Sequence, residues 1–224
     1  MTFSGPLGGA GGGLAALERT ERIYMAQTAG RECCCKANRF EIKASPEDED
    51  LLVALEEPTT LLNLCAGKSR GFVSAVTDPR WGSVAFHVER PWMPCCTTSC
   101  QVTEGPPGQG GAALGSVDYN CCAACSEILE VKDKLGITML RIEGPCAGCR
   151  CCADVVFKLI SPTTDSEVGS ITRVFQGACG EACTYKSRYW LDFPKDADVA
   201  LKATLVGAVL LLDILFHEDD GNNN

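Results

Sequence analysis

The apolar run Val199–Phe216 (VALKATLVGAVLLLDILF) constrains this chain more than any other segment of its sequence. It is apolar on nearly every side, a pattern that indicates a buried helix rather than one with an exposed face. Lys202 and Asp213 interrupt the run and leave a ten-residue uncharged core, Ala203–Leu212. A helix of that length covers about 15 Å, roughly half the hydrocarbon thickness of a bilayer. We therefore expect a helix inside a protein core in preference to a membrane span.

Small and charged residues in this run add two expectations. A small-residue side is formed by Ala200, Ala203, Thr204, Gly207 and Ala208. Such a side suits close approach by another backbone, in a tight core or in a helix pair within lipid. Lys202 and Asp213 are about three turns apart, so they lie on one side near opposite ends of the helix. In a barrel they would lie near its two mouths, whereas in a membrane they would mark a functional site.

The net charge of the chain limits the classes of partner that it is expected to bind. The chain has 224 residues and 46% hydrophobic content, enough for one sizeable domain. Its net charge is −9. The chain lacks the basic face of a nucleic-acid-binding protein, so no nucleic-acid partner is expected. The same charge argues against docking on anionic lipid through a polybasic patch.

Sixteen cysteines are far more than an average chain of this length carries. The N-terminal stretch MTFSGPLGGAGGGL lacks the basic and apolar regions of a secretory signal. We therefore expect a reducing, cytosolic setting, in which metal binding or lipidation is favoured over disulfide bridging. Adjacent cysteines, such as Cys95 and Cys96, point to opposite faces of an extended chain and make poor disulfide partners for one another.

Short alternating segments, separated by turn sequences such as TDPRWG and GPPGQGG, fill most of the chain. Their regular spacing is typical of hairpins in a barrel or a sandwich. The predicted strands are Arg22–Gln27, Arg39–Ala44, Phe72–Val76, Ser83–Val88, Gln101–Glu104, Leu114–Asn120, Glu127–Lys132, Gly136–Glu143, Asp154–Ile160, Val168–Phe175 and Lys186–Phe193. We predict a mainly β fold, a closed antiparallel barrel of about 10–12 strands around the helix 199–216. One central helix would bury the inner face of every strand and its own whole circumference.

Three segments are expected to lie outside this pattern of strands. Residues 1–17 are rich in Gly and Ala and residues 219–224 are polar, so both are expected to be disordered around a domain at 18–218. The segment 45–62 opens with a helix-start pattern, in which Ser45 is the cap and Pro46 lies in the first turn. Pro58 ends it, so we expect a short helix or an acidic surface insertion there.

Three further motifs stand out in the sequence. They are Glu89-Arg90-Pro91 followed by Cys95, Cys96 and Cys100; Gly144-Pro145-Cys146-Ala147-Gly148-Cys149-Arg150-Cys151-Cys152 followed by Asp154-Val155; and Phe193-Pro194, Asp196 and Asp198 before the apolar helix and Phe216-His217-Glu218. These motifs resemble those of the phospholipid scramblases, and the likeness extends from about residue 19 to residue 218. The resemblance implies a tubby-like barrel of antiparallel strands around a central helix.

The same resemblance implies a function without covalent chemistry, so we do not expect an enzyme. It implies calcium-triggered, ATP-independent and bidirectional movement of phospholipids between membrane leaflets. The implied partners are membrane phospholipids, with assembly into a homo-oligomer left open. The implied location is the cytoplasmic face of the plasma membrane, reached through palmitate on acylated cysteines, with a contribution from the C-terminal helix left open. The alternative is a lipid-anchored tubby-like adaptor or regulator that transports nothing.

The resemblance also implies a calcium-binding loop before the helix, and here the chain departs from the family. Tyr185 and Ser187 occupy the first two acidic positions of that loop, while Asp196 keeps the last one. Asp192 and Asp198 lie nearby and complete the expected calcium set. Calcium prefers roughly six to eight oxygen ligands, so a loop without its first two carboxylates is expected to bind calcium weakly.

Two cysteine sets are candidate sites. Cys95, Cys96 and Cys100 follow a predicted strand and are expected to be palmitoylated, since two acyl chains anchor a protein stably where one is marginal. Plain thiols are the alternative, and residues 33–35 form a second candidate set for acylation. Zinc-like spacing occurs in Cys146 with Cys149 and in Cys179 with Cys183, for which packed core thiols are the alternative.

Overall fold

The computed structural model describes residues 12–29, 38–57, 70–92, 97–120, 128–145, 153–177 and 186–216. Its elements are, in chain order, α1 (Gly12–Glu18), β1 (Arg22–Ala29), β2 (Arg39–Lys43), β3 (Leu52–Glu56), β4 (Phe72–Asp78), β5 (Ser83–Arg90), β6 (Thr97–Thr103), β7 (Ala113–Asn120), β8 (Ile128–Asp133), β9 (Thr138–Glu143), β10 (Val155–Ile160), β11 (Glu167–Arg173), β12 (Arg188–Asp192) and α4 (Val199–Phe216).

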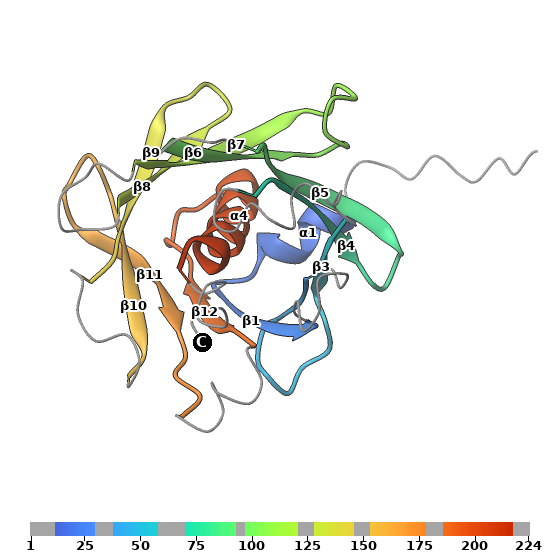
Figure 1. The fold of residues 1–224 in the computed structure, drawn as a ribbon, viewed down its shortest axis with the longest axis horizontal. Coiled ribbons are helices and arrows are strands. Elements are labelled where there is room, and N and C mark those ends of the chain that lie inside the picture. Colours follow the sequence, from blue (N-terminus) through green and yellow to red (C-terminus); the bar gives the residue numbers. More distant parts are fainter. Residues whose placement is uncertain are drawn as a thin grey trace, which may run out of the picture.

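The strands form one closed antiparallel barrel, as predicted. Each strand pairs with the next along the chain, and β1 pairs with both β2 and β12 (Figure 1). Tyr24 shows this closure, because its register partners are Lys43 on one side and Trp190 on the other. Closure pairs every strand on both sides, so the sheet presents no open edge to another chain.

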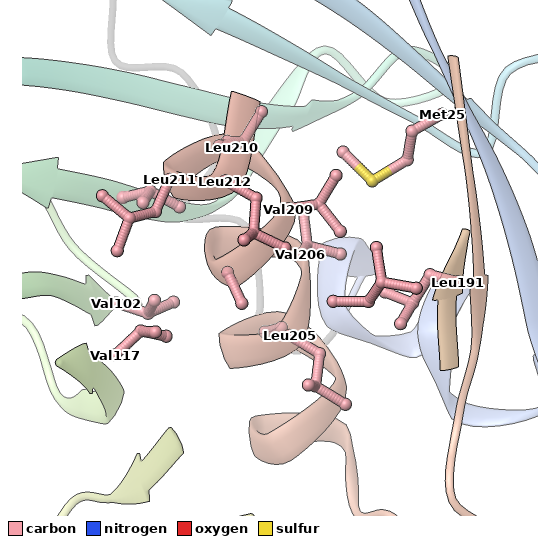
Figure 2. Close-up of a cluster of buried hydrophobic side chains, with 14 of the residues drawn as sticks. Met25, Val102, Val117, Leu191, Leu205, Val206, Val209, Leu210, Leu211 and Leu212 are labelled. Atoms are coloured by element: carbon pink, nitrogen blue, oxygen red, sulfur yellow. The ribbon is translucent and has the colours of Figure 1, made fainter. Parts of the chain in front are cut away.

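The apolar helix α4 lies inside the barrel, also as predicted (Figure 1). Its residues 202–215 are all buried, against β6, β7 and β8 on one side. Figure 2 shows Val209 directed toward Met25, while Leu211 lies on the side of Val102 and Val117. Alternation along the strands therefore supplies the apolar wall that an apolar helix of this kind needs.

The N-terminal segment is partly ordered, so the expected disorder of residues 1–17 is wrong for its last part. Helix α1 packs against β4, β5 and α4, and its Leu17 is fully buried. A helix this short gains its stability from packing rather than from propensity. Gly13 permits the contact, since a Cβ there would lie 2.4 Å from the Cβ of Ala85. Residues 1–11 lie outside the described residues.

The segment 45–62 also differs from its prediction of a helix or an insertion. Its apolar part, Leu52–Glu56, is strand β3, which pairs with β2 and β4 as part of the barrel. Its acidic part, Glu47–Asp50, belongs to the turn that precedes β3. Pairing on both sides outweighs a local helix-start pattern in so short a segment.

The barrel has two chemically different ends. Because the strands alternate in direction, every connection that follows an odd-numbered strand lies at one end and every connection that follows an even-numbered strand lies at the other. All cysteines other than Cys100 fall, in sequence, after an odd-numbered strand. We call that end the cysteine end and the opposite one the turn end.

Candidate functional site

Buried polar side chains face the inside of the barrel near the cysteine end. They share strand faces with core residues two positions away, as alternation requires. We call the following set the polar mouth: Gln27, Asn38, Glu56, Arg70, Arg90, Thr98, Ser187, Tyr189 and Asp213. Polar groups buried in this way need partners, because each unpaired group would cost roughly 1–3 kcal/mol.

A buried ion pair forms one side of the polar mouth. Arg70 Nη1 lies 2.5 Å from Glu56 Oε1, and its Nη2 lies 3.4 Å from Oε2. Both side chains are almost fully buried, at 1% and 3% exposure. Removing one member of such a pair typically costs about 3–5 kcal/mol, since the other charge is left buried.

Gln27 connects three segments at the closure of the barrel. Its Nε2 donates to Asn38 Oδ1 at 3.1 Å, and its Oε1 accepts from the backbone N–H of Ser187 at 3.0 Å. The backbone N–H of Gln27 donates in turn to the Ser187 carbonyl oxygen. The polar mouth thus helps to hold β1 beside the start of β12.

The two charged residues of α4 lie near opposite ends of the barrel, as predicted. Asp213 accepts a hydrogen bond from the Tyr189 hydroxyl at 3.0 Å, near the cysteine end. Burial, followed by the nearby Asp213 charge, raises the pKa of Tyr189 well above its usual value. At the turn end, Lys202 Nζ donates to the carbonyl oxygens of Leu17, Glu18 and Thr20 at 2.8–3.0 Å. A cation at the C-terminal end of α1 is favourable for the helix dipole.

Gly207 lies where α4 approaches the barrel wall closely. A Cβ at this position would lie 2.9 Å from Val102 Cγ2 and 3.4 Å from Val88 Cγ1. Its carbonyl oxygen lies 3.9 Å from Cys100 Sγ. The expected close approach along the small-residue side therefore occurs inside the barrel.

Cys100 is unsuited to the acylation that was expected of it. Its side chain is fully buried between β6 and α4. Burial raises the pKa of the thiol to about 12, so the reactive thiolate is absent at neutral pH. Palmitate on Cys100 is therefore disfavoured in the folded barrel, and its presence stays a prediction.

Two of the three expected calcium carboxylates have other partners in this structure. Asp192 pairs with Arg22 at 2.9 Å and accepts from Ser170, while Asp198 accepts the Leu201 N–H at 2.8 Å as the cap of α4. Strand β12 occupies the middle of the segment that would have formed the loop. Within the part of the chain that the structure describes, no three His, Cys, Asp or Glu side chains could hold a metal ion. Calcium binding by Asp192, Asp196 and Asp198 stays a prediction.

The remaining predicted sites lie outside the described residues. They are Cys95 and Cys96, the segment 33–35, and the zinc-spaced residues Cys146, Cys149, Cys179 and Cys183. Acylation and zinc binding at these positions stay predictions.

Sequence reasoning missed the polar mouth and the docking of α1. The sequence held a signal for the polar mouth, since Glu56 and Arg90 stand two positions after apolar residues that face the core. Nothing in the Gly-rich sequence around α1 indicated that its carbonyl groups would meet Lys202.

The helices offer one further observation. Of those that the structure describes, none is long and apolar enough to cross a membrane.

A closed antiparallel barrel around one apolar helix is the arrangement that the resemblance implied. The family model Scramblase matches residues 13–219, a range that includes all twelve strands of the barrel and α4. The chain belongs to the scramblase family.

Several curated relatives carry the same family name. Phospholipid scramblase 1 of Mus musculus is 31% identical over 191 residues, which cover 83% of this chain and 56% of the mouse protein. Phospholipid scramblase 2 of Homo sapiens is 30% identical over 188 residues, covering 81% of this chain and 61% of the relative. The chain thus spans little more than half the length of these relatives. No solved structure matches the chain significantly.

Proposed function

We propose that this protein moves phospholipids between the two leaflets of a membrane, in both directions, without ATP and without covalent chemistry. The family match over residues 13–219 carries this proposal, because it covers the barrel together with its central helix. Relatives named phospholipid scramblases at about 30% identity support it.

The filled interior of the barrel limits how lipids could move. A headgroup needs a polar route across the apolar layer. Buried side chains such as Leu205, Val209 and Leu212 occupy the centre of the barrel around α4. The proposed route therefore runs outside the barrel, across a locally thinned bilayer or between the protomers of a homo-oligomer.

Membrane attachment is proposed through palmitate on Cys95 and Cys96, at the cytoplasmic face of the plasma membrane. These two cysteines follow β5 at the cysteine end, where their sequence neighbour Trp92 is 58% exposed. Two acyl chains at one position suffice for stable anchoring.

Calcium has no step in this proposal. The family resemblance implies a calcium trigger, but Asp192 and Asp198 are engaged in an ion pair and a helix cap. Lipid exchange is accordingly expected not to depend on calcium binding to this segment.

The test is leaflet exchange of fluorescent phospholipid in liposomes that carry the purified protein, with calcium stepped from none to millimolar. Exchange at all calcium concentrations is expected, and Asp196→Ala should leave it unchanged. Exchange that requires calcium and is lost in Asp196→Ala would contradict the calcium-independent proposal. Absence of exchange from folded, membrane-bound protein would reject lipid movement itself.

The second candidate function is a lipid-anchored adaptor without transport activity. The observation that favours it is the filled barrel, in which α4 is enclosed along residues 202–215. An adaptor would bind liposomes through its acylated cysteines but leave the leaflets unmixed at every calcium concentration.

A further inference from the structure

Large apolar side chains project into solvent at the turn end of the barrel. Trp81, in the turn between β4 and β5, is 75% exposed, and Val84 beside it is 46% exposed. In the β8–β9 hairpin, Leu135 is 75% exposed, Ile137 57% and Met139 42%. We call these five residues the apolar tips. Single exposed apolar residues are common on protein surfaces, but here they gather on two hairpins at one end.

The two hairpins lie on the same arc of the barrel. In the strand order, β6 and β7 separate β5 from β8 (Figure 1). Neighbouring strands are about 4.8 Å apart, so the hairpins are separated by roughly 20 Å along the sheet. Both turns follow even-numbered strands and therefore lie at the same end. One flat surface can touch both sets of apolar tips.

Each turn holds its apolar residues outward by its own hydrogen bonds. Asp78 accepts from the Arg80 backbone N–H at 3.0 Å and from the Arg80 guanidinium at 2.6 and 2.9 Å. Asp133 Oδ1 accepts the N–H groups of Leu135 and Ile137, each at 2.9 Å. Such turns are ordered before any partner arrives, so binding would not have to order them.

The turns that carry the apolar tips have little net charge. The β4–β5 turn is locally neutral, because Arg80 is paired with Asp78, whose pKa that hydrogen bond lowers. The acidic turn Glu47–Asp50 precedes β3 and Asp165 lies between β10 and β11, so both flank the arc of the tips, and the exposed Glu104 lies in the β6–β7 turn between the two hairpins. The two hairpins can therefore approach a surface with the flanking acidic turns at the edge of the contact.

We propose that the apolar tips insert into the interface of a phospholipid bilayer, so that the arc from Trp81 to Ile137 contacts lipid. The inference rests on the membrane association in the proposed function. Trp prefers the boundary between headgroups and acyl chains, and Leu and Ile prefer the layer beneath it. Two sets of apolar tips on either side of the polar, Gly-rich β6–β7 turn suit a soft lipid surface better than a continuous apolar protein interface. The net charge of −9 directs this contact to zwitterionic rather than anionic lipid.

The exposed tryptophans make the test direct, since Trp81 and Trp92 stand at opposite ends of β5. Trp92→Phe with Trp190→Phe leaves Trp81 as the one tryptophan, and Trp81→Phe with Trp190→Phe leaves Trp92. The unacylated full chain is mixed with phosphatidylcholine vesicles that carry brominated or ordinary acyl chains. Brominated chains are expected to quench at least half of the Trp81 fluorescence. Vesicle-bound protein with unquenched Trp81, or no binding to the vesicles, would overturn the proposal.

A second pair of variants separates lipid insertion from loss of fold. Leu135→Ser combined with Ile137→Ser should weaken partition into the vesicles about tenfold or more. Val156→Ser is the matched control, because Val156 is 43% exposed on β10, away from the tips, and should leave partition unchanged. Equal partition of both proteins would overturn the proposal, provided that their melting temperatures match the parent.

Quenching reports contact and leaflet exchange reports transport, so the two proposals fail separately. Quenched Trp81 without exchange would keep the docking surface and reject lipid movement. Leaflet exchange with unquenched Trp81 fluorescence would keep lipid movement and reject the docking surface.

Discussion

At the scale of single residues, substitutions of Gly207 test whether the barrel encloses α4. Gly207→Ala raises the helix propensity by about 1 kcal/mol, which offsets part of the steric cost of the new contact with Val102. The melting temperature of this variant should therefore change little. Gly207→Leu adds three further carbons to a filled space and should destabilise the domain by roughly 3 kcal/mol or more. Thermal unfolding followed by circular dichroism measures both. A Leu variant that melts like the parent would show that α4 is not enclosed by the barrel.

Cys100 makes the stability of the folded barrel depend on pH in the alkaline range. Its folded pKa of about 12 lies above the ordinary thiol value of 9.0. Below pH 9 the thiol is neutral in both states, so its contribution to stability is constant. As pH rises from 9 toward 12, only the unfolded thiol ionises, and stability falls by up to about 1.4 kcal/mol per pH unit. Tyr189, whose pKa is also raised, acts in the same direction at higher pH.

Cys100→Val isolates this contribution, because valine keeps an apolar side chain of similar size and cannot ionise. Denaturant unfolding in reducing buffer should give the variant a shallower loss of stability between pH 9 and 11 than the parent shows. Parallel curves for the two proteins would mean that Cys100 reaches solvent in the native state.

At the scale of elements, α1 depends on a single side chain of α4. Lys202→Met keeps the apolar stem but leaves the carbonyl oxygens of Leu17, Glu18 and Thr20 without this donor. We expect a loss of about 2–4 kcal/mol and faster hydrogen exchange in Gly12–Glu18. The exposed Lys195 provides the control variant, Lys195→Met, which should exchange like the parent. Unchanged protection of α1 in Lys202→Met would show that the three hydrogen bonds do not hold it.

The elements also show what the sequence could and could not predict. The closed barrel and its helix follow from local signals, namely alternation such as that in Phe72–Asp78 and the apolar run Val199–Phe216. Strand β3 was missed because its pairing partners, not its own residues, decide its conformation. Helix α1 was missed for a related reason, since contacts far away in sequence stabilise it.

At the scale of the whole molecule, the cysteine end is predicted to control membrane attachment. Cys95→Ser with Cys96→Ser should move the protein from membrane to soluble fractions of cells, because two acyl chains are lost together. Cys100→Ser is the matched control, since its buried thiol is not expected to carry palmitate and its loss should leave the distribution unchanged. Unchanged fractionation of the double variant would remove Cys95 and Cys96 as the anchor.

The site was less predictable than the fold. Burial lowers the reactivity of Cys100, and the folded chain places Asp192 in an ion pair and Asp198 at the cap of a helix. Both properties depend on residues that the folded chain brings together, such as Arg22 beside Asp192. Residue type and spacing alone cannot reveal them.

The pairing of β1 with β12 has a consequence for how a cell makes this protein. A ribosome delivers the first strand long before the last strand and α4, so the growing sheet carries open edges and an uncovered apolar face throughout synthesis. Contacts between distant segments also form slowly. The barrel can therefore close only after both β12 and α4 have been synthesised, and until then partly made chains expose strand edges to one another.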